Sequence, residues 1–311
     1  MKKPKKILEN ERHLLSQVWN FGMPIEKSFE KEPFYNSIVY VGRTFPQVIK
    51  NLLKLYTKPG DKVLDPTVGS GTTCYESYKL GRHSVGIDIS KFAINNLKKR
   101  WNKYPPSSLN DKTPTYSFAV DDARKLTSIK DEKFDLIIVS PPWFKITSFG
   151  KSAQSNKTLD RAQTYPKFLE DLSHIFKRSY ELLNDDGYLA VISGDNTVGD
   201  NRYAISSHTT VLCEEIGFKF HYEFTNVTEC FYGKYSLAEM SSSEKNKVIK
   251  NSQGFGLVED ILVFKKIGNA PKYFEFTTKD SLEISGNFDL DNVKKRDNEI
   301  RDSCEQYEST K

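Results

Sequence analysis

Cysteine is scarce in this sequence and is not clustered. The 311 residues include four cysteines, and none of them forms a Cys-x-x-Cys pair: Cys74, Cys213, Cys230 and Cys304. This spacing excludes a zinc ribbon and a small disulfide scaffold, and it favours a reducing setting. We therefore expect a cytoplasmic protein that has no metal site with cysteine ligands.

Long apolar runs are absent as well. The strongest run, FDLIIV at 134–139, has the length of a strand and is too short to cross a bilayer. The basic start, MKKPKK, is not followed by an apolar segment. We therefore expect no secretory signal and no membrane partner.

Positive charge is distributed unevenly along the chain. The net charge is +5, yet residues 269–311 carry seven Lys or Arg and ten Asp or Glu, which leaves +8 for residues 1–268. A positive body suits a polyanion such as nucleic acid, although charge alone fits an ordinary basic protein equally well. We expect an N-terminal extension over 1–41, a main domain over 42–268 and a charged C-terminal tail over 269–311.

Strand-like and helix-like segments alternate across the main domain. This alternation predicts an α/β fold with a doubly wound, mostly parallel sheet of seven strands. Residues 225–259 contain no long amphipathic helix, so the last strand is expected to return antiparallel. The expected strands are 62–65, 83–88, 116–120, 134–139, 188–193, 218–224 and 260–266, and the clearest expected helices begin at Pro46 and Ser90 or span 166–183 and 205–216.

A glycine-rich loop follows the first expected strand, in VLDPTVGSGTT at 63–73. Such a loop lets the backbone approach a ligand and exposes amides at the start of the next helix. The loop lacks the third glycine of a dinucleotide fingerprint, because Thr72 and Thr73 continue it. The acid before it, Asp65, would repel a phosphate and attract an ammonium group.

Acidic residues follow three successive expected strands, at the edge of the sheet where ligands bind. They are Asp65, Asp88 and the pair Asp121–Asp122. An acid in the second of these places commonly accepts hydrogen bonds from ribose hydroxyls, while helix caps and turns explain any one of the acids alone. Taken together, they fit a nucleoside with a cationic side arm, such as S-adenosylmethionine, better than NAD or ATP.

The fourth expected strand leads directly into Ser140-Pro141-Pro142-Trp143. Two prolines fix the backbone and remove two N–H donors, which leaves the neighbouring carbonyls as rigid acceptors. Ser140 adds a hydroxyl, and Trp143 adds a flat aromatic face. Such a corner can accept both hydrogens of an exocyclic amino group while the ring stacks on the base.

Together, LDPTVGSGTT and SPPW resemble the motifs of amino-group DNA methyltransferases, which methylate cytosine at N4 or adenine at N6. The resemblance covers about residues 42–266. It implies a class I, Rossmann-like methyltransferase fold, S-adenosylmethionine as methyl donor and no metal. It assigns catalysis to Ser140, Pro141, Pro142 and Trp143, and cofactor binding to Phe45, Asp65, Pro66, Gly69, Gly71, Thr72, Asp88 and Asp122.

Two of these assignments involve a choice. Asp122 is preferred to Asp121 because it directly precedes Ala-Arg, as in the family's segment at this place. Phe45 is included because Thr67 stands where the family usually carries a large aromatic residue. Both choices rest on the resemblance.

The first residue of the catalytic tetrad indicates the target base. Serine there is the form most associated with cytosine-N4 enzymes, so the resemblance implies a site-specific enzyme acting on a cytosine flipped out of double-stranded DNA. Adenine-N6 methylation, methylation of an RNA base, and a non-catalytic nucleic-acid-binding protein remain alternatives. The cofactor motif precedes the catalytic motif, whereas many relatives with the serine form have the opposite order. No cysteine lies in the loop, which disfavours carbon-5 methylation.

Two segments are expected to contact DNA. Residues 144–167 hold five Lys or Arg and one Asp, and residues 226–258 hold four Lys and three Glu beside Phe231, Tyr232 and Tyr235. Such segments can track phosphates and reach base edges, with solvated loops as the alternative. The resemblance also implies a restriction-modification system, with a cognate endonuclease as genomic partner and a nucleoid-associated location.

Overall fold

The computed structural model describes residues 17–20, 32–36, 44–108, 113–145, 158–198, 200–227, 231–232, 235–236 and 258–267. The chain divides into two units, Met1–Pro271 and Lys272–Lys311. All of the described residues belong to the first unit. The expected tail and most of 226–258 lie outside the described residues.

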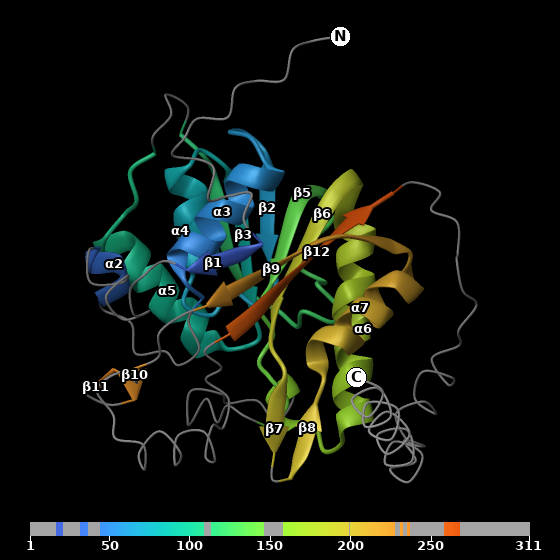
Figure 1. The fold of residues 1–311 in the computed structure, drawn as a ribbon. Helices are drawn as coiled ribbons and strands as arrows, with labels where there is room; N and C mark the ends of the chain where they lie inside the picture. Colours follow the sequence, from blue (N-terminus) through green and yellow to red (C-terminus); the bar gives the residue numbers. More distant parts are fainter. Residues whose placement is uncertain are drawn as a thin grey trace, which may run out of the picture. The chain divides into compact units, whose positions relative to one another are not determined.

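Eight strands form the main sheet, in the order β1-β9-β12-β6-β5-β2-β3-β4 (Figure 1). Each neighbouring pair is parallel except the two pairs of β12, which runs antiparallel to β6 and β9. The predicted parallel sheet with an antiparallel last strand is therefore confirmed, but the predicted number of seven is wrong. The strands are β1 (Val18–Asn20), β2 (Lys62–Asp65), β3 (His83–Asp88), β4 (Tyr116–Val120), β5 (Phe134–Val139), β6 (Leu183–Ser193), β9 (Phe218–Val227) and β12 (Val258–Lys266).

The additional strand, β1, comes from the expected N-terminal extension and pairs parallel with β9. Its Trp19 is only 2% exposed, and the indole stacks on Phe224 with ring centroids 4.3 Å apart. Burial of a large aromatic side chain stabilises such a contact by about 1.5–3 kcal/mol. A strand of three residues shows no periodicity, so its sequence could not predict it.

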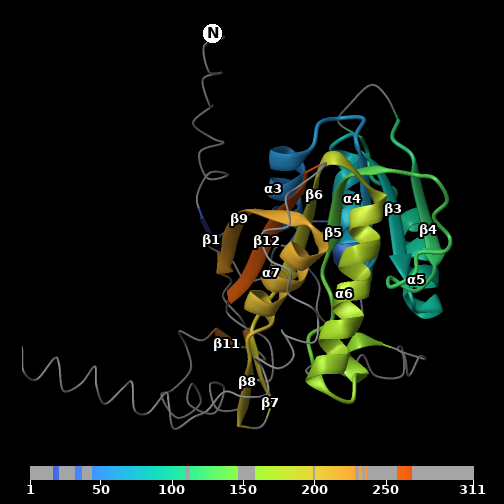
Figure 2. The same ribbon diagram turned by 90° about the vertical axis from the view of Figure 1, so that its right-hand side faces the viewer.

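In the described part of the chain, helices cover both faces of the sheet (Figures 1 and 2). One face carries α3 (Pro46–Tyr56), α4 (Thr72–Lys79) and α5 (Lys91–Lys103), and the other carries α6 (Tyr165–Leu182) and α7 (Ile205–Ile216). Right-handed crossovers produce this arrangement because the strand order runs one way from β2 to β4 and the other way from β5 onward. The order reverses between β2 and β5.

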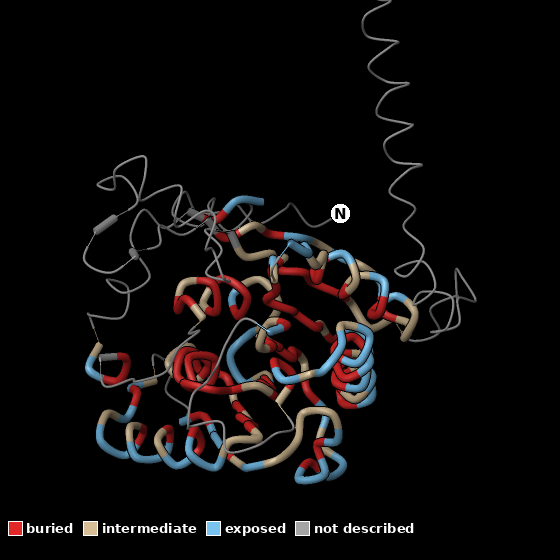
Figure 3. Tube along the Cα trace, turned by 90° about the horizontal axis from the view of Figure 1, so that it is seen from below, coloured by how far each residue is buried: buried red, intermediate tan, exposed pale blue. Residues whose placement is uncertain are grey.

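Residues of β2 alternate between the two faces, as the strand period of two requires. Val63 packs in the cluster that contains α3, whereas the next residue, Leu64, packs in the cluster that contains α6. Ile138 and Ile137 of β5 divide in the same way. Figure 3 shows buried segments gathered at the centre of the described part of the chain and exposed residues on the outer turns of the helices. Both central strands are thus fixed from two sides.

The transition from α6 to β6 differs from the prediction. The helix ends at Leu182, within one residue of the predicted end at 183, but β6 begins at Leu183, so the predicted strand start at Tyr188 was wrong. A register shift in the β5–β6 pairing absorbs the intervening residues, since Phe134 pairs with Leu183 and Leu136 with Tyr188. The side-chain amide of Asn184 donates to Asp135 Oδ1 at 2.9 Å, which holds this irregular segment against β5.

Several short elements were not predicted. A hairpin of β7 (Asn196–Val198) and β8 (Asn201–Tyr203) follows β6 and projects beyond the sheet (Figure 1). The others are α2 (Pro33–Asn36), the 3-10 turn η3 (Leu159–Arg161) and the paired strands β10 (Phe231–Tyr232) and β11 (Tyr235–Ser236). No helix in the described part of the chain is long and apolar enough to cross a membrane.

Candidate active site

The two predicted motifs lie at the same edge of neighbouring strands. Asp65 is the last residue of β2, and Ser140 follows the last residue of β5. These strands pair parallel, with Leu64 opposite Ile137, and the strand order reverses between them. In an open parallel sheet this is where ligands bind. The fold thus brings the glycine-rich loop and the Ser-Pro-Pro-Trp loop together, as predicted.

The glycine-rich loop has a fixed shape. Its turn is closed by the Gly71 amide, which donates to the Val68 carbonyl at 2.7 Å. Gly71 has φ +88°, and a Cβ on it would lie 2.3 Å from a methyl group of Leu97, so glycine is required here. Arg100 of α5 donates to the Ser70 carbonyl at 2.6 Å. The loop is therefore held both from within and from α5.

The remaining predicted loop residues, Pro66, Gly69 and Thr72, are buried beside it. The Thr72 hydroxyl lies 3.2 Å from that of Ser70. Thr72 is the first residue of α4, and Gly71 is its N-cap. These residues occupy the place expected of cofactor-binding residues, and their assignment stays a prediction.

Asp65 is a buried carboxylate, 4% exposed, at the tip of β2. Its Oδ1 accepts hydrogen bonds from the backbone amide of Thr67 at 2.9 Å and from the Thr67 hydroxyl at 3.3 Å. Burial raises the pKa of Asp65 to about 6, against the opposing hydrogen bonds from Thr73 and Thr67. A nearby cation favours the charged form of such a group, so Asp65 is suited to hold a positively charged ligand.

Asp88 connects the loop to the next helix. Its Oδ2 accepts from the Gly69 amide at 3.0 Å and its Oδ1 from the Ser90 amide at 2.8 Å. Burial raises the pKa of this carboxyl group, and the two amides oppose that effect. Each carboxylate oxygen has two acceptor positions, so Asp88 can fix the loop and accept ribose hydroxyls at the same time.

Asp122 is engaged in an ion pair within its own turn. Arg124 donates to its two carboxylate oxygens, from Nε to Oδ1 at 2.9 Å and from Nη2 to Oδ2 at 2.7 Å. Although burial acts to raise the pKa of Asp122, these hydrogen bonds hold it below the ordinary value. Arg124 also reaches Asp171 of α6 at 3.0 Å. A structural role for Asp122 is therefore clear, and its predicted role in cofactor binding stays a prediction.

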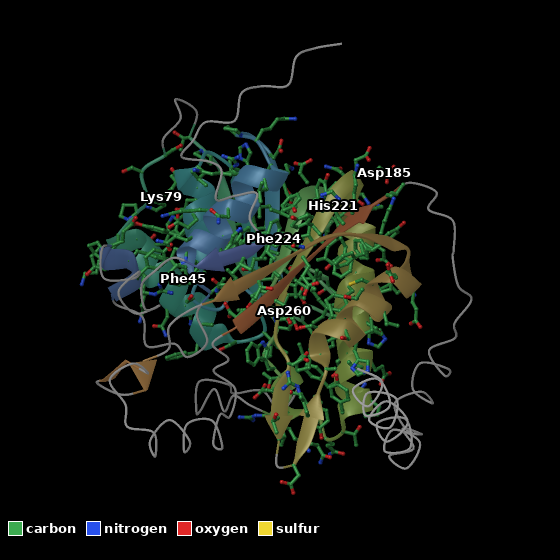
Figure 4. The ribbon with its side chains drawn as sticks, viewed as in Figure 1. Phe45, Lys79, Asp185, His221, Phe224 and Asp260 are labelled. Carbon is green, nitrogen blue, oxygen red and sulfur yellow. The ribbon has the colours of Figure 1, made fainter. Side chains whose placement is uncertain are left out.

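Phe45 is wholly buried at the start of α3. It packs in the cluster that contains Trp19, Val48 and Phe224 (Figure 4). The ring is part of the core between α3 and the sheet, and contact of Phe45 with a cofactor stays a prediction.

Ser140 is held by two threonines that were not assigned to the site. Its backbone amide donates to Thr67 Oγ1 at 3.0 Å, and its Oγ accepts from the hydroxyl of Thr44 at 3.3 Å. A hydroxyl oxygen has two acceptor lone pairs, so Ser140 can accept one further hydrogen. In the sequence, Thr67 was notable only because it stands where the family usually carries a large aromatic residue.

The rest of the tetrad packs against the end of β6. Pro141 is buried, and Pro142 and Trp143 are half-buried. The indole of Trp143 lies on Gly194, where an added Cβ would come within 2.7 Å of the ring. Gly194 directly follows β6, and sequence reasoning missed it because a single glycine after a strand carries no specific signal.

Beyond the tetrad, the chain is anchored in an aromatic box. Phe144 is 1% exposed, and its ring contacts those of Tyr165 and Tyr203 at centroid distances of 5.3 and 5.0 Å. The side-chain amide of Asn196, in β7, donates to the Phe144 carbonyl at 2.6 Å. The hairpin and α6 thus fix the chain where it leaves the Ser-Pro-Pro-Trp loop.

The chemistry of these groups fits S-adenosylmethionine. Asp65 offers a buried negative charge, Asp88 offers acceptors for hydroxyl groups, and the loop between them requires glycine at position 71. Within the described ranges, no three His, Cys, Asp or Glu side chains are grouped to hold a metal ion.

The fold defines the class of this protein. An open sheet with this strand order, a glycine-rich loop after β2 and an antiparallel β12 make up the class I, Rossmann-like methyltransferase fold. The chain belongs to the methyltransferase domain family, whose model matches residues 57–247. A DNA methylase model matches residues 1–99. S-adenosylmethionine is accordingly the methyl donor.

Curated relatives are Type II methyltransferases by name. The chain is 32% identical over 87 residues to the Type II methyltransferase M.MjaII of Methanocaldococcus jannaschii, covering 28% of this chain and 16% of the relative. It is 33% identical over 86 residues to M.BamHI of Bacillus amyloliquefaciens, covering 28% and 18%. The chain thus spans about a fifth or less of the relatives it matches. These matches confirm the resemblance to amino-group DNA methyltransferases, and the SPPW subtype stays a prediction.

Similar solved structures are also methyltransferases. TrmN from Thermus thermophilus has 17% identity and a TM-score of 0.47, covering 76% of this chain and 52% of that one. A SAM-dependent methyltransferase from Methanosarcina mazei has 16% identity and a TM-score of 0.46, covering 70% and 97%. The fold assignment is based on the strand order of the chain itself.

Proposed function

We propose that this protein transfers a methyl group from S-adenosylmethionine to the N4 amino group of a cytosine flipped out of double-stranded DNA. The observation that carries this proposal is the contact between Ser140 of the tetrad and Thr67 of the cofactor loop. It joins a corner suited to an amino group to a site suited to a sulfonium nucleoside. The DNA methylase match and the Type II relatives support DNA as the substrate.

Three groups at this edge of the sheet hold the cofactor in this proposal. Asp65 binds its ammonium group, Asp88 accepts hydrogen bonds from its ribose hydroxyls, and the backbone around Gly69 allows close approach. The sulfonium would supply an electrophilic methyl group: the S–CH3 bond breaks as the N–CH3 bond forms, a neutral thioether leaves, and the methylated amino group gives up one proton to water. Asp65 and Ser140 follow neighbouring strands, so the methyl group and the target base are held on adjacent loops.

Ser140 and Pro141 activate the base. A cytosine amino nitrogen is conjugated with the ring and is a poor nucleophile. Its two hydrogens are accepted by Ser140 Oγ and by the carbonyl of Pro141, which favours a pyramidal nitrogen with its lone pair directed at the methyl group. Positioning and electrostatic stabilisation lower the barrier without a covalent intermediate. Flipping the base costs a few kcal/mol, and stacking on Trp143 offsets part of that cost.

The segment 144–167 is proposed to contact the DNA backbone as it leaves the tetrad. Lys145 is exposed, whereas residues 146–157 lie outside the described residues. Lys167 forms ion pairs with Glu170 and Asp171 at 2.9 and 3.2 Å. These carboxylates offset its charge, so Lys167 contributes less to the positive charge of the segment. Residues 226–258 are proposed as a second contact, and a cognate endonuclease as a genomic partner.

The proposal is tested by separating binding from turnover at Ser140. Ser140→Ala should bind S-adenosylmethionine as the wild type does and lose most methyl transfer, because the lost interaction is made mainly in the transition state. Ser173→Ala on α6 is the matched control, since its hydroxyl contacts only the Glu170 carbonyl among the hydrogen bonds found in the described ranges. Wild-type turnover in Ser140→Ala would contradict the assigned role.

A further inference from the structure

We propose that Thr67 is a positioning residue that connects the cofactor-binding acid Asp65 to the catalytic Ser140. This inference rests on the proposed function for the role of Ser140, and it goes beyond it by naming how the two loops are coupled. Thr67 lies between the two motifs in space, although 73 positions separate it from Ser140 in the chain.

A single hydroxyl makes both contacts. Thr67 Oγ1 donates to Asp65 Oδ1 at 3.3 Å and accepts from the Ser140 backbone amide at 3.0 Å. A hydroxyl group has one donor and two acceptor positions, so the two hydrogen bonds are compatible. The Thr67 amide also donates to the same carboxylate oxygen at 2.9 Å, which fixes the residue over Asp65.

The sheet leaves a gap that this hydroxyl fills. The register of β2 and β5 ends at Leu64 opposite Ile137. Beyond that point β2 continues by one residue and β5 by two, and the β2–β5 ladder does not extend to Ser140. The Thr67 side chain takes the place of a ladder bond, because it accepts from the Ser140 amide.

The direction of coupling follows from charge. A hydrogen bond to an ionised acceptor is stronger than one to a neutral acceptor. A cation bound at Asp65 keeps the carboxylate ionised, which strengthens its hold on the Thr67 hydroxyl. A polarised hydroxyl is in turn a better acceptor for the Ser140 amide. Cofactor binding therefore stiffens the catalytic loop before the base arrives.

A matched pair of variants isolates this role. Thr67→Val and Thr73→Val each remove one hydroxyl that bonds to Asp65, but only Thr67 also holds Ser140. Both variants should weaken S-adenosylmethionine binding, measured by calorimetry. Thr67→Ser keeps the hydroxyl and should restore the wild-type behaviour.

The decisive readout is amide hydrogen exchange in the peptide around Ser140. Saturating S-adenosylmethionine should slow this exchange in the wild type and in Thr73→Val. In Thr67→Val, the factor by which it slows the exchange should be at least tenfold smaller. Equal protection in all three proteins would overturn the inference. This measurement needs no DNA, so it is independent of whether the target base is correctly assigned.

Turnover supplies the second readout. At saturating cofactor, Thr67→Val should lose at least tenfold more methyl transfer than Thr73→Val. Equal losses would also overturn the inference. If the wild type shows no transfer to DNA at all, the proposed function fails, while the exchange experiment still decides the link between Thr67 and Ser140.

Discussion

Asp65 is more deeply buried than the other two acids predicted to bind the cofactor, Asp88 and Asp122. It is 4% exposed, and burial raises its pKa to about 6. The folded pKa lies above the unfolded value of 3.8, so ionisation of Asp65 costs stability. That cost is absent below pH 4, grows as the pH rises towards 6 and is complete above it. The protein thus retains a destabilising charge at the place where we propose that the cofactor's positive end binds.

Replacement of Asp65 by Asn should separate stability from binding. Asn keeps an acceptor for the Thr67 amide and removes the buried charge, so Asp65→Asn should raise the free energy of unfolding at pH 7 by about 1–3 kcal/mol. The gain should vanish below pH 4. Denaturant unfolding at both pH values measures it, and a loss of stability at pH 7 would contradict the account.

We expect the same residue to set the pH dependence of cofactor binding. The affinity for S-adenosylmethionine should fall as the pH drops through about 6, because the neutral carboxyl group no longer attracts the ammonium group. Calorimetry across pH 5 to 8 measures this. Asp65→Asn should bind weakly at every pH, and a wild-type affinity that does not change over this range would exclude Asp65 from the cofactor site.

Asp88 has both a structural role and a proposed binding role. Asp88→Ala should lose cofactor binding and also about 1–3 kcal/mol of stability, because the amides of Gly69 and Ser90 both lose their acceptor. Asp88→Asn keeps an acceptor for one amide and should lose less stability. Calorimetry and thermal unfolding measure the two effects. Unchanged affinity in Asp88→Ala would contradict the ribose assignment.

At the scale of elements, the sequence predicted those with a strong period. β2, β3, β4, β5 and α7 match their expected bounds, because apolar residues alternate or recur at helical spacing. The start of β6 was missed because the register shift beside Asp135 depends on a neighbouring strand. β1 and the β7–β8 hairpin have three-residue strands, and long-range packing determines them.

The same limit applies to the site. The residues that carry charge or fixed backbone, such as Asp65, Gly71 and Pro141, are recognisable by type and spacing. Thr44, Gly194 and Asn196 were missed, because each acts through a contact with a distant loop. The sequence therefore indicated candidate ligand-binding groups, but it did not indicate the groups that hold them in place.

Among the contacts that hold the Ser-Pro-Pro-Trp loop, the packing of Trp143 on Gly194 is the simplest to test. Gly194→Ala places a Cβ within 2.7 Å of the Trp143 ring, so the ring must move. Overpacking of this kind costs about 1–3 kcal/mol. Chemical denaturation should show that loss, and it should be much smaller when Trp143 is Ala. Equal losses in the two backgrounds would show that the ring does not rest on this glycine.

At the scale of the whole molecule, positive charge is concentrated in the part of the sequence that is proposed to contact DNA. Residues 1–268 carry the net positive charge, and residues 144–167 concentrate part of it directly after the tetrad in the chain. Neutralising phosphates releases counterions, so binding to DNA should weaken with salt. This effect needs no base contact and is independent of the target base.

Neutralising Lys151, Lys157 and Arg161 together should reduce the slope of log affinity against log salt by up to about 0.9 per lost phosphate contact. The control replaces Lys54, Lys58 and Lys130, exposed lysines that precede β2 and β5 and so lie toward the opposite edge. Fluorescence anisotropy with a labelled duplex measures both slopes. Equal slopes would place the DNA elsewhere.

The identity of the methylated base in the product DNA tests the proposed function most directly. DNA incubated with the protein and S-adenosylmethionine, then digested to nucleosides and analysed by mass spectrometry, should contain N4-methylcytosine, and DNA treated with Ser140→Ala should contain almost none. N6-methyladenine alone would show that serine at this position does not select cytosine. No methylated nucleoside in DNA would contradict the account as a whole.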